Sequence, residues 1–370
     1  MSNPKRQRKL IAGALVLIPG FLLMLSMVAL PLPSTMEDVE IAYTEILPVD
    51  YDESVLKPLE KMAETKDYGQ CTVRNAIFPA HPIEPCFSAS YPGSGAKMTW
   101  LLIEAITGLQ THNDITFEGK QHAVTTKTHY PSKEGHLLDG HETVPRAIVV
   151  LRQPLNALPS YFNYLYEMEN QLENHSTRAP IEAWIKWRDT YLQQELEAWR
   201  NFVDYWMQKY TPVNRLLASF EKLTDDVMGP AETTRVAEFL SRSEGVHTCP
   251  PELIPCVWHK VVKYKDSNSS GNEGRRLQVV DASDAERGPG LANFQIDPTK
   301  FALSDPTQPN SQRSGPEYIP PYTQEQFDSV KVILNGLIEK YSHEKSLVPI
   351  LESYIDGVDK RKEELKMEGN

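Results

Sequence analysis

A lysine and a histidine lie two residues apart in the segment Lys127-Thr128-His129-Tyr130-Pro131. Side chains two residues apart point to the same side of an extended chain, so both are expected to face one ligand. A neutral imidazole can take a proton from a hydroxyl, and an ammonium group can neutralise a leaving oxyanion. The pair therefore predicts a site for group transfer to a hydroxyl, and the alternative is an ordinary surface histidine.

A glycine-rich stretch, residues 90–100 (S-Y-P-G-S-G-A-K-M-T-W), precedes a predicted helix. Glycine lets the backbone approach a ligand closely, and the N–H groups at a helix start face an anion. Lys97 and the hydroxyls of Ser94 and Thr99 would add charge and hydrogen bonds. We expect this stretch to bind a phosphate through Pro92, Gly93, Ser94, Gly95, Ala96, Lys97, Met98, Thr99 and Trp100; an ordinary turn with a helix cap is the alternative.

The stretch departs from the pattern G-x-x-x-x-G-K-S/T of nucleotide triphosphatases, because Ala96 separates Gly95 from Lys97. No obvious magnesium-binding acid follows an apolar strand either. A nucleotide kinase is therefore the weaker interpretation.

A third candidate, Arg152, follows the apolar run 146–151, and Ser160 lies eight residues later. A guanidinium group and a hydroxyl near a helix start suit a second phosphate. The alternative is that Arg152 pairs with a carboxylate. Pro159 is unfavourable inside a helix, so the helix is expected to start late or to kink there.

These candidates lie in a chain that alternates between predicted strands and helices. Such alternation indicates βαβ units and a mainly parallel sheet, whose ligands bind beyond the carboxyl ends of the strands. The expected strands are Cys86–Ser90, Ala123–Thr126, Arg146–Leu151 and Arg215–Phe220. The expected helices are Leu56–Met62, Lys97–Leu109, Asn156–Glu169, Ile181–Gln208, Ala231–Ser241 and Gln324–Ser342.

The N-terminus predicts a membrane anchor. Leu10 to Leu30 is a run of 21 uncharged residues, which as a helix spans a bilayer core. Four basic residues precede the run and acidic residues follow it, which favours a cytoplasmic tail 1–9 and a lumenal remainder. The run exceeds the usual core of a cleaved signal peptide, which is the alternative.

Four cysteines, Cys71, Cys86, Cys249 and Cys256, follow the apolar run. An even number in an oxidising compartment suggests two disulfides, and Cys71–Cys86 with Cys249–Cys256 gives the shortest loops among three possible pairings. Free buried thiols are the alternative. Two glycosylation sequons, which begin at Asn174 and Asn268, support a lumenal location.

Together the three motifs resemble the sulfotransferases that use 3′-phosphoadenosine 5′-phosphosulfate. Those enzymes carry segments similar to P-K-S-G-T-T-W, K-T-H-x-P and R-x-P-x-x-x-x-x-S, in the order found here. Weaker similarities continue at Trp199, Trp206, residues 216–223 and residues 236–240, so the resemblance covers roughly 85–280. It implies an α/β, P-loop-like three-layer fold with a mainly parallel central sheet flanked by helices.

The resemblance also implies a role for each site residue. The glycine-rich stretch would hold the 5′-phosphosulfate, and Arg152 with Ser160 the 3′-phosphate. His129 would be the general base, and Lys127 with Lys97 would stabilise negative charge. Glu104, on the helix after the stretch, is a second candidate base.

Several positions depart from the family pattern. Gly93 stands where soluble members carry a lysine, two extra residues lie between Gly95 and Trp100, and Phe220 replaces a common tyrosine. The late cofactor loop of the family has no clean counterpart. Residues 271–276, with Arg275 and Arg276, are the first candidate for it, and 287–290 the second; either is equally a plain surface loop.

The expected protein is a Golgi single-pass type II sulfotransferase with a carbohydrate acceptor and no metal. Its expected divisions are a tail 1–9, an anchor 10–30, a stem 31–80, a sulfotransferase domain 81–355 and a charged tail 356–370. The formal charge of −12, near −16 without the basic tail, excludes a non-specific nucleic-acid binder and favours a neutral or weakly charged acceptor. A lumenal binding protein without catalysis is the alternative class; oligomeric state is not predicted.

Overall fold

The computed structural model describes residues 44–47, 53–114, 123–137, 140–172, 176–263 and 318–368. The expected anchor Leu10–Leu30, both sequon asparagines and the candidate cofactor residues Arg275 and Arg276 lie outside the described residues. Within the described ranges no helix is both long and apolar enough to cross a bilayer.

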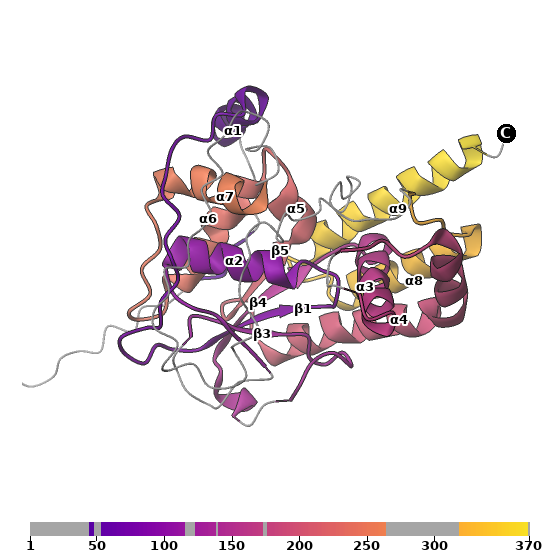
Figure 1. The fold of residues 1–370 in the computed structure, drawn as a ribbon, viewed down its shortest axis with the longest axis horizontal. Coiled ribbons are helices and arrows are strands. Elements are labelled where there is room, and N and C mark those ends of the chain that lie inside the picture. The colour runs from indigo at the N-terminus through magenta and orange to yellow at the C-terminus, as the bar shows by residue number, and fades with distance from the viewer. Residues whose placement is uncertain are drawn as a thin grey trace, which may run out of the picture. The chain divides into compact units, whose positions relative to one another are not determined.

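The described chain from residue 44 onward is built on a five-stranded sheet (Figure 1). The strands are β1 (Cys86–Ser90), β2 (His112–Asn113), β3 (Thr126–Thr128), β4 (Arg146–Leu151) and β5 (Arg215–Ser219). Their order is β2-β3-β1-β4-β5, and each neighbouring pair is parallel. The predicted parallel α/β sheet is therefore confirmed.

Helices cover both faces of this sheet. They are α1 (Glu53–Thr65), α2 (Ala96–Thr107), α3 (Pro154–Glu169), α4 (Ile181–Lys209), α5 (Phe220–Thr224), α6 (Gly229–Leu240), α7 (Ile254–Val262), α8 (Gln324–Lys340) and α9 (Val348–Glu368), with short 3-10 turns at His141–Thr143 and Pro251–Leu253.

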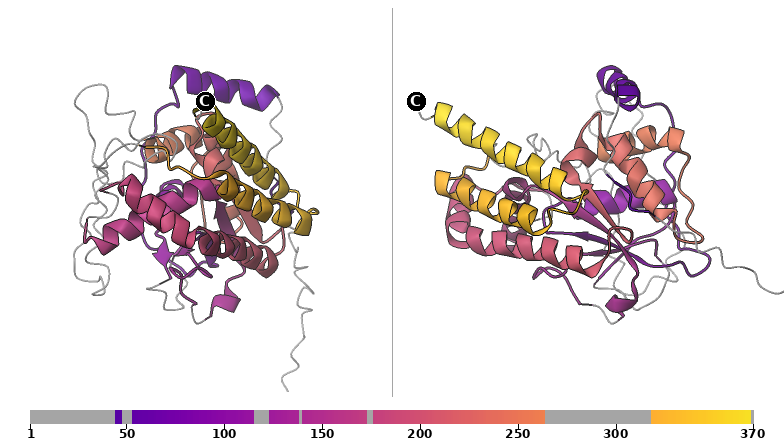
Figure 2. Two further views of the ribbon diagram at one scale, coloured as in Figure 1. Left: turned by 90° about the vertical axis from the view of Figure 1, so that its right-hand side faces the viewer. Right: turned by 180° about the vertical axis from the view of Figure 1, so that it is seen from behind.

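The two faces of β4 bury alternate side chains against different helices. Ala147, Val149 and Leu151 pack with α3, α4, α8 and α9. Ile148 and Val150 pack with α2, α6 and α7 on the other face. A strand buried on both sides must be apolar throughout, which explains why the run 147–151 lacks alternation. Figures 1 and 2 show the helices in these two layers, with α8 and α9 side by side.

The helix α3 continues through Pro159, where the sequence predicted a late start or a kink. Proline has no N–H, so the carbonyl of Leu155, four residues earlier, loses its helical donor. The hydroxyl of Tyr322 donates to this carbonyl at 3.1 Å, and Arg361 Nη1 lies 3.4 Å from it. Donors from the C-terminal region thus replace the missing hydrogen bond.

Several expected boundaries differ in the structure. The strand expected at Ala123–Thr126 is displaced to Thr126–Thr128, because residues 126–128 are those in register with β1. The strand 215–220 ends at Ser219, whose side chain accepts a bond from the Lys222 N–H and caps α5. The helix α9 continues to Glu368 and buries Val358, so no break separates residue 355 from the expected charged tail.

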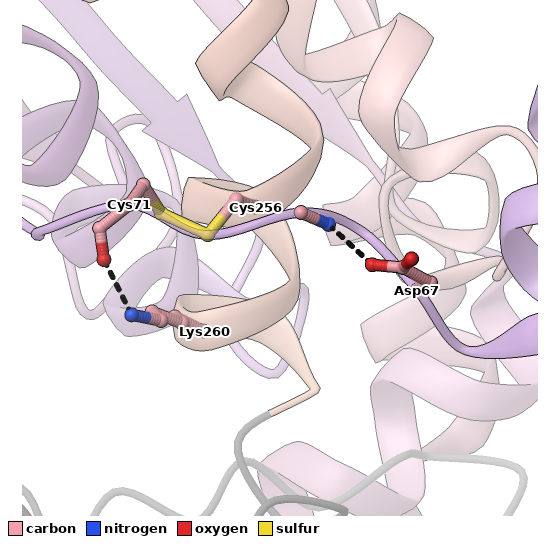
Figure 3. The surroundings of a disulfide bond; sticks show 5 residues. Asp67, Cys71, Cys256 and Lys260 are labelled. Atoms are coloured by element: carbon pink, nitrogen blue, oxygen red, sulfur yellow. Dashed lines mark hydrogen bonds between the residues drawn. A yellow bond between two sulfur atoms is a disulfide. The ribbon is translucent and has the colours of Figure 1, made fainter.

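The disulfide pairing expected from loop length is wrong. One disulfide joins Cys71 to Cys256 on α7, while Cys86 and Cys249 are free buried thiols. Cys86 lies in the central strand β1, and Cys71 is bonded to Cys256, 185 residues later, so short sequence separation did not decide the pairing. Lys260 Nζ donates to the Cys71 carbonyl beside the bridge (Figure 3).

Candidate functional site

The three sequence motifs meet at one edge of the sheet. The order β3-β1-β4 makes their strands direct neighbours, and parallel strands end at a common edge. The loop after β1 (residues 91–95, here the glycine loop), the segment 127–131 and the segment beginning at Arg152 therefore converge. This convergence is the central expectation of the sequence, and the structure shows it.

The glycine loop is held in a shape that only glycine permits at two positions. Gly93 and Gly95 have φ angles of 79° and 85°, in the left-handed region. A Cβ on Gly93 would lie 2.3 Å from the Ala157 carbonyl oxygen of α3, and one on Gly95 would lie 2.4 Å from the Phe220 ring. The loop is thus tightly packed between α3 and the Phe220 ring.

The interior of this loop has a donor suited to an anion. Ser94 is fully buried, and its hydroxyl has no hydrogen-bond partner within the described residues. A buried hydroxyl without a partner is costly, and a bound oxyanion would satisfy it. Gly95, the N-cap of α2, has no side chain to cap the first N–H groups of that helix. These donors fit the phosphate that the sequence predicts.

Lys97 lies in the first turn of α2 and is half-buried. Burial lowers the pKa of its ammonium group to about 8. A nearby anion favours the charged form and would raise that pKa again. The structure places Lys97 at the helix start, and its role toward an anionic ligand stays a prediction.

The imidazole of His129 is fixed by a backbone carbonyl of β1. Its Nδ1 lies 2.7 Å from the Ser90 carbonyl oxygen, which can only accept. Nδ1 therefore carries the proton and donates, and Nε2 keeps its lone pair. This is the tautomer that a general base requires, with the ring oriented by a third group.

Burial and a neighbouring charge keep His129 neutral. Burial is the larger cause and the Lys127 ammonium the second; together they lower the His129 pKa to about 4. Burial also lowers the pKa of Lys127, while Asp114 and Glu134 act in the opposite direction. The structure thus brings Lys127 and His129 together, as the two-residue spacing predicted.

Asp114 orders this segment, a role that sequence reasoning missed. Its Oδ2 accepts from the Thr128 hydroxyl at 2.7 Å and from the His136 N–H at 3.0 Å. Thr128 Oγ1 in turn accepts from the Tyr130 N–H at 3.0 Å. The buried carboxylate follows β2, a two-residue strand too short to be recognised by its pattern.

Arg152 links the third motif to the glycine loop. It is only 4% exposed, and its Nη1 donates to the Gly93 carbonyl. Its guanidinium carbon lies 4.4 Å from the centre of the Phe220 ring, the ring that also packs against Gly95. Burial raises the pKa of the nearby Glu221, while the Gln153 N–H and the Arg152 charge act in the opposite direction.

Ser160 is half-buried on α3, in the turn that packs against the loop. The backbone of that turn, from Ala157 to Tyr161, is what a Cβ on Gly93 would strike. Ser160 and Arg152 therefore belong to one structural unit with the glycine loop.

Two tryptophans of α4 donate hydrogen bonds to the backbone of the segments that carry Arg152 and His129. Trp199 Nε1 donates to the Arg152 carbonyl at 3.2 Å, and Trp206 Nε1 donates to the Tyr130 carbonyl at 2.8 Å. Both indoles are fully buried. The sequence showed these residues only as a weak similarity, and the structure gives them a physical role.

Glu104, the second candidate base, is engaged elsewhere. Its Oε1 accepts from Trp100 Nε1 at 2.6 Å and from the Thr111 N–H at 2.9 Å. Burial raises its pKa. The side chain thus ties α2 to the start of the segment that leads to β2, while His129 has the lone pair available for proton transfer.

Comparisons with known proteins identify no family. No protein-family model matches the chain, and no curated protein matches it. A crystal structure of mouse sulfotransferase SULT7A1 complexed with PAP matches over 82% of this chain and 95% of that chain, with 12% identity and a TM-score of 0.42. At these values the likeness carries no weight for the chemistry, which rests on the site itself.

Proposed function

We propose that this protein transfers a sulfuryl group from 3′-phosphoadenosine 5′-phosphosulfate to a hydroxyl, or an amine, of a carbohydrate acceptor. The observation that carries the proposal is the geometry at the edge formed by β3, β1 and β4. There a neutral, oriented histidine, two lysines and an arginine lie at a loop whose buried Ser94 hydroxyl has no hydrogen-bond partner among the described residues. The three motifs that resemble the sulfotransferases are the source of these residues.

The co-substrate would supply an activated sulfuryl group and a phosphate leaving group. On this chain, the Ser94 hydroxyl, the first N–H groups of α2 and Lys97 are the donors for its 5′ end. Arg152 and Ser160 would hold the 3′-phosphate, because a guanidinium fork matches phosphate oxygens. A bound anion would stabilise the charged forms of Lys97 and Lys127, because burial disfavours an isolated charge on either ammonium group.

At Nε2, His129 would take the proton from the hydroxyl or amine of the acceptor. The Ser90 carbonyl holds the other ring nitrogen at 2.7 Å, so the ring cannot turn without losing that bond. Lys127 would stabilise the negative charge that develops beside it. Of the described residues, no three His, Cys, Asp or Glu side chains are grouped to bind a metal ion, and the proposed roles use none.

We also propose a lumenal location for the catalytic domain, in a Golgi type II protein anchored by residues 10–30. Support comes from the Cys71–Cys256 disulfide, which is typical of an oxidising compartment. The order of basic tail and apolar run in the sequence supports the same orientation.

Calorimetry with 3′-phosphoadenosine 5′-phosphate tests the nucleotide site. We expect binding by the wild type and a loss in Arg152→Ala. Transfer of radiolabelled sulfate to a panel of acceptors tests the reaction. His129→Ala is expected to lower its rate on the order of 10²–10⁴-fold while nucleotide binding persists. His247→Ala, at an exposed histidine, is the matched control. Absence of nucleotide binding in the wild type would refute the proposal.

A further inference from the structure

A cavity of about 270 Å³ lies beside the segment that follows the proposed catalytic histidine in the chain. Its walls include Tyr91 and Pro92 of the glycine loop and Pro131, Ser132 and Lys133, which follow His129 in the chain. The Ser132 N–H donates to the His129 carbonyl at 2.9 Å. The cavity is thus bounded by the two segments that carry the reacting groups.

The helix α4 forms another wall. It contributes Gln194, Ala198 and Asn201, which lie at helical spacings of four and three, together with Glu195. Glu195 is the buried member, with a side chain 4% exposed. A carboxylate buried at this depth is uncommon unless it is paired.

The Glu195 carboxylate is held from two sides. The Tyr91 hydroxyl donates to Oε2, and Lys133 Nζ donates to Oε1 at 2.8 Å. Lys133 also lies 5.4 Å from the centre of the Tyr161 ring. An ionised carboxylate has about four acceptor directions, so two remain after these bonds. Glu195 is therefore a preorganised acceptor for hydroxyl groups of a ligand.

The charges of the cavity lining offset each other. Of the described lining residues, Lys133 is the cation, and Glu195 already pairs with it. Burial, followed by the Glu195 charge, raises the pKa of Tyr91 well above its usual range, so its phenol stays protonated and neutral. The Glu195–Lys133 pair has no net charge, so neither an anionic nor a cationic ligand would find an unpaired counter-charge among the described lining residues.

The remaining lining fits a ring-shaped polyol. Gln194 and Asn201 offer amide donors and acceptors, and Pro92, Pro131 and Ala198 offer apolar surface for C–H groups. The volume is near the lower end of ligand cavities, which suits one ring and not a long chain. We propose that this cavity is the acceptor site, and that it takes a neutral sugar ring whose hydroxyls bond to Glu195. This inference rests on the proposed function and adds the place and class of the acceptor.

Saturation-transfer NMR on the full chain, with 3′-phosphoadenosine 5′-phosphate present, tests this site. The probes are the methyl glycosides of glucose, galactose and N-acetylglucosamine, against methyl glucuronide, glucosamine and a tyrosine-containing peptide. We expect signals from at least one neutral glycoside and at least tenfold weaker binding of the charged sugars and the peptide. Preferential binding of glucuronide, glucosamine or the peptide would overturn the inference.

Three variants locate the binding. Ala198→Phe fills the cavity, Asn201→Ala changes an exposed wall residue, and Glu195→Gln removes the charge. Each should weaken glycoside binding about tenfold or more. Glu197→Gln, on the exposed side of the same helix, is the matched control and should leave it unchanged. If Glu195→Gln does not fold, the other two variants decide the matter.

Nucleotide calorimetry separates the two proposals. Unchanged nucleotide affinity with lost glycoside binding in Ala198→Phe supports the acceptor site. Glycoside binding that survives both Ala198→Phe and Asn201→Ala overturns it, even where the nucleotide binds. Absence of nucleotide binding in the wild type refutes the proposed function, while the NMR titration without nucleotide still tests the cavity.

Discussion

The pKa of His129 gives the sharpest test of the proposed mechanism. Burial and Lys127 lower it to about 4, well below the ordinary 6.5. A base with this pKa is about 97% neutral near pH 5.5, whereas an ordinary histidine would be only about 9% neutral there. The profile of kcat/KM, which reports the free enzyme, should therefore stay nearly flat from about pH 7.5 to 5.5 and fall near pH 4.

The protonation of the His129 ring can be measured directly. In ¹⁵N NMR of histidine-labelled protein, the His129 signals should titrate near pH 4, with the proton on Nδ1 above that pH. His129→Gln identifies the signals. Lys127→Met removes the second cause of the shift, so the His129 pKa should rise toward 6.5 and the acid limb should move to higher pH. A wild-type ring that titrates near 6.5 would refute the reasoning.

The lowered pKa of His129 also makes the folding stability depend on pH. The unfolded chain protonates His129 near pH 6.5, whereas the folded chain protonates it only near pH 4. Between these values the unfolded state binds more protons, so folding stability falls as the pH falls from 6.5 to 4. The loss over this interval should be smaller in His129→Gln, and urea unfolding at several pH values measures it.

Three further predictions concern the anion site and the framework. Lys97→Ala should weaken binding of 3′-phosphoadenosine 5′-phosphate about tenfold by calorimetry, and unchanged affinity together with unchanged activity would exclude Lys97 from the site. Arg152→Lys should weaken the same binding about 10- to 100-fold, because a lysine lacks the guanidinium fork; an affinity equal to wild type would contradict that role. The Cys71–Cys256 disulfide closes a loop of 185 residues, so Cys256→Ser should lower the free energy of unfolding by up to about 5 kcal/mol in urea; no change would argue against the bridge.

The sheet was predictable where its strands are buried on both faces. Cys86–Ser90 and Arg146–Leu151 have the expected bounds, and every residue of both strands is buried. In Arg146–Leu151 the continuous apolar run marks a parallel strand covered on both faces. The segment β2 was not predicted, because two residues have no pattern. The helix α7 was also missed; its nine residues include a proline near the start, and its burial is a tertiary effect.

The candidate site residues were predictable by type and by position in the chain, but their contacts were not. The motifs indicated Lys127, His129 and Arg152 at strand ends, and the structure places them there. The Asp114 carboxylate, the Ser90 carbonyl and the indoles of α4 act through contacts 14 to 76 residues apart in the chain. No local sequence pattern indicates partners so far apart in the chain, so they are identified only in the folded structure.

The disulfide also determines how the chain behaves when its backbone is cut. All five strands lie between Cys71 and Cys256, so the bridge turns the sheet region into one covalent ring. A single protease cut within that ring leaves both pieces joined until the bridge is reduced. A cut between α7 and α8 lies outside the ring and leaves α8 and α9 held by packing alone. Non-reducing and reducing gels of a nicked sample would therefore report whether the protease acted inside or outside the ring closed by Cys71 and Cys256.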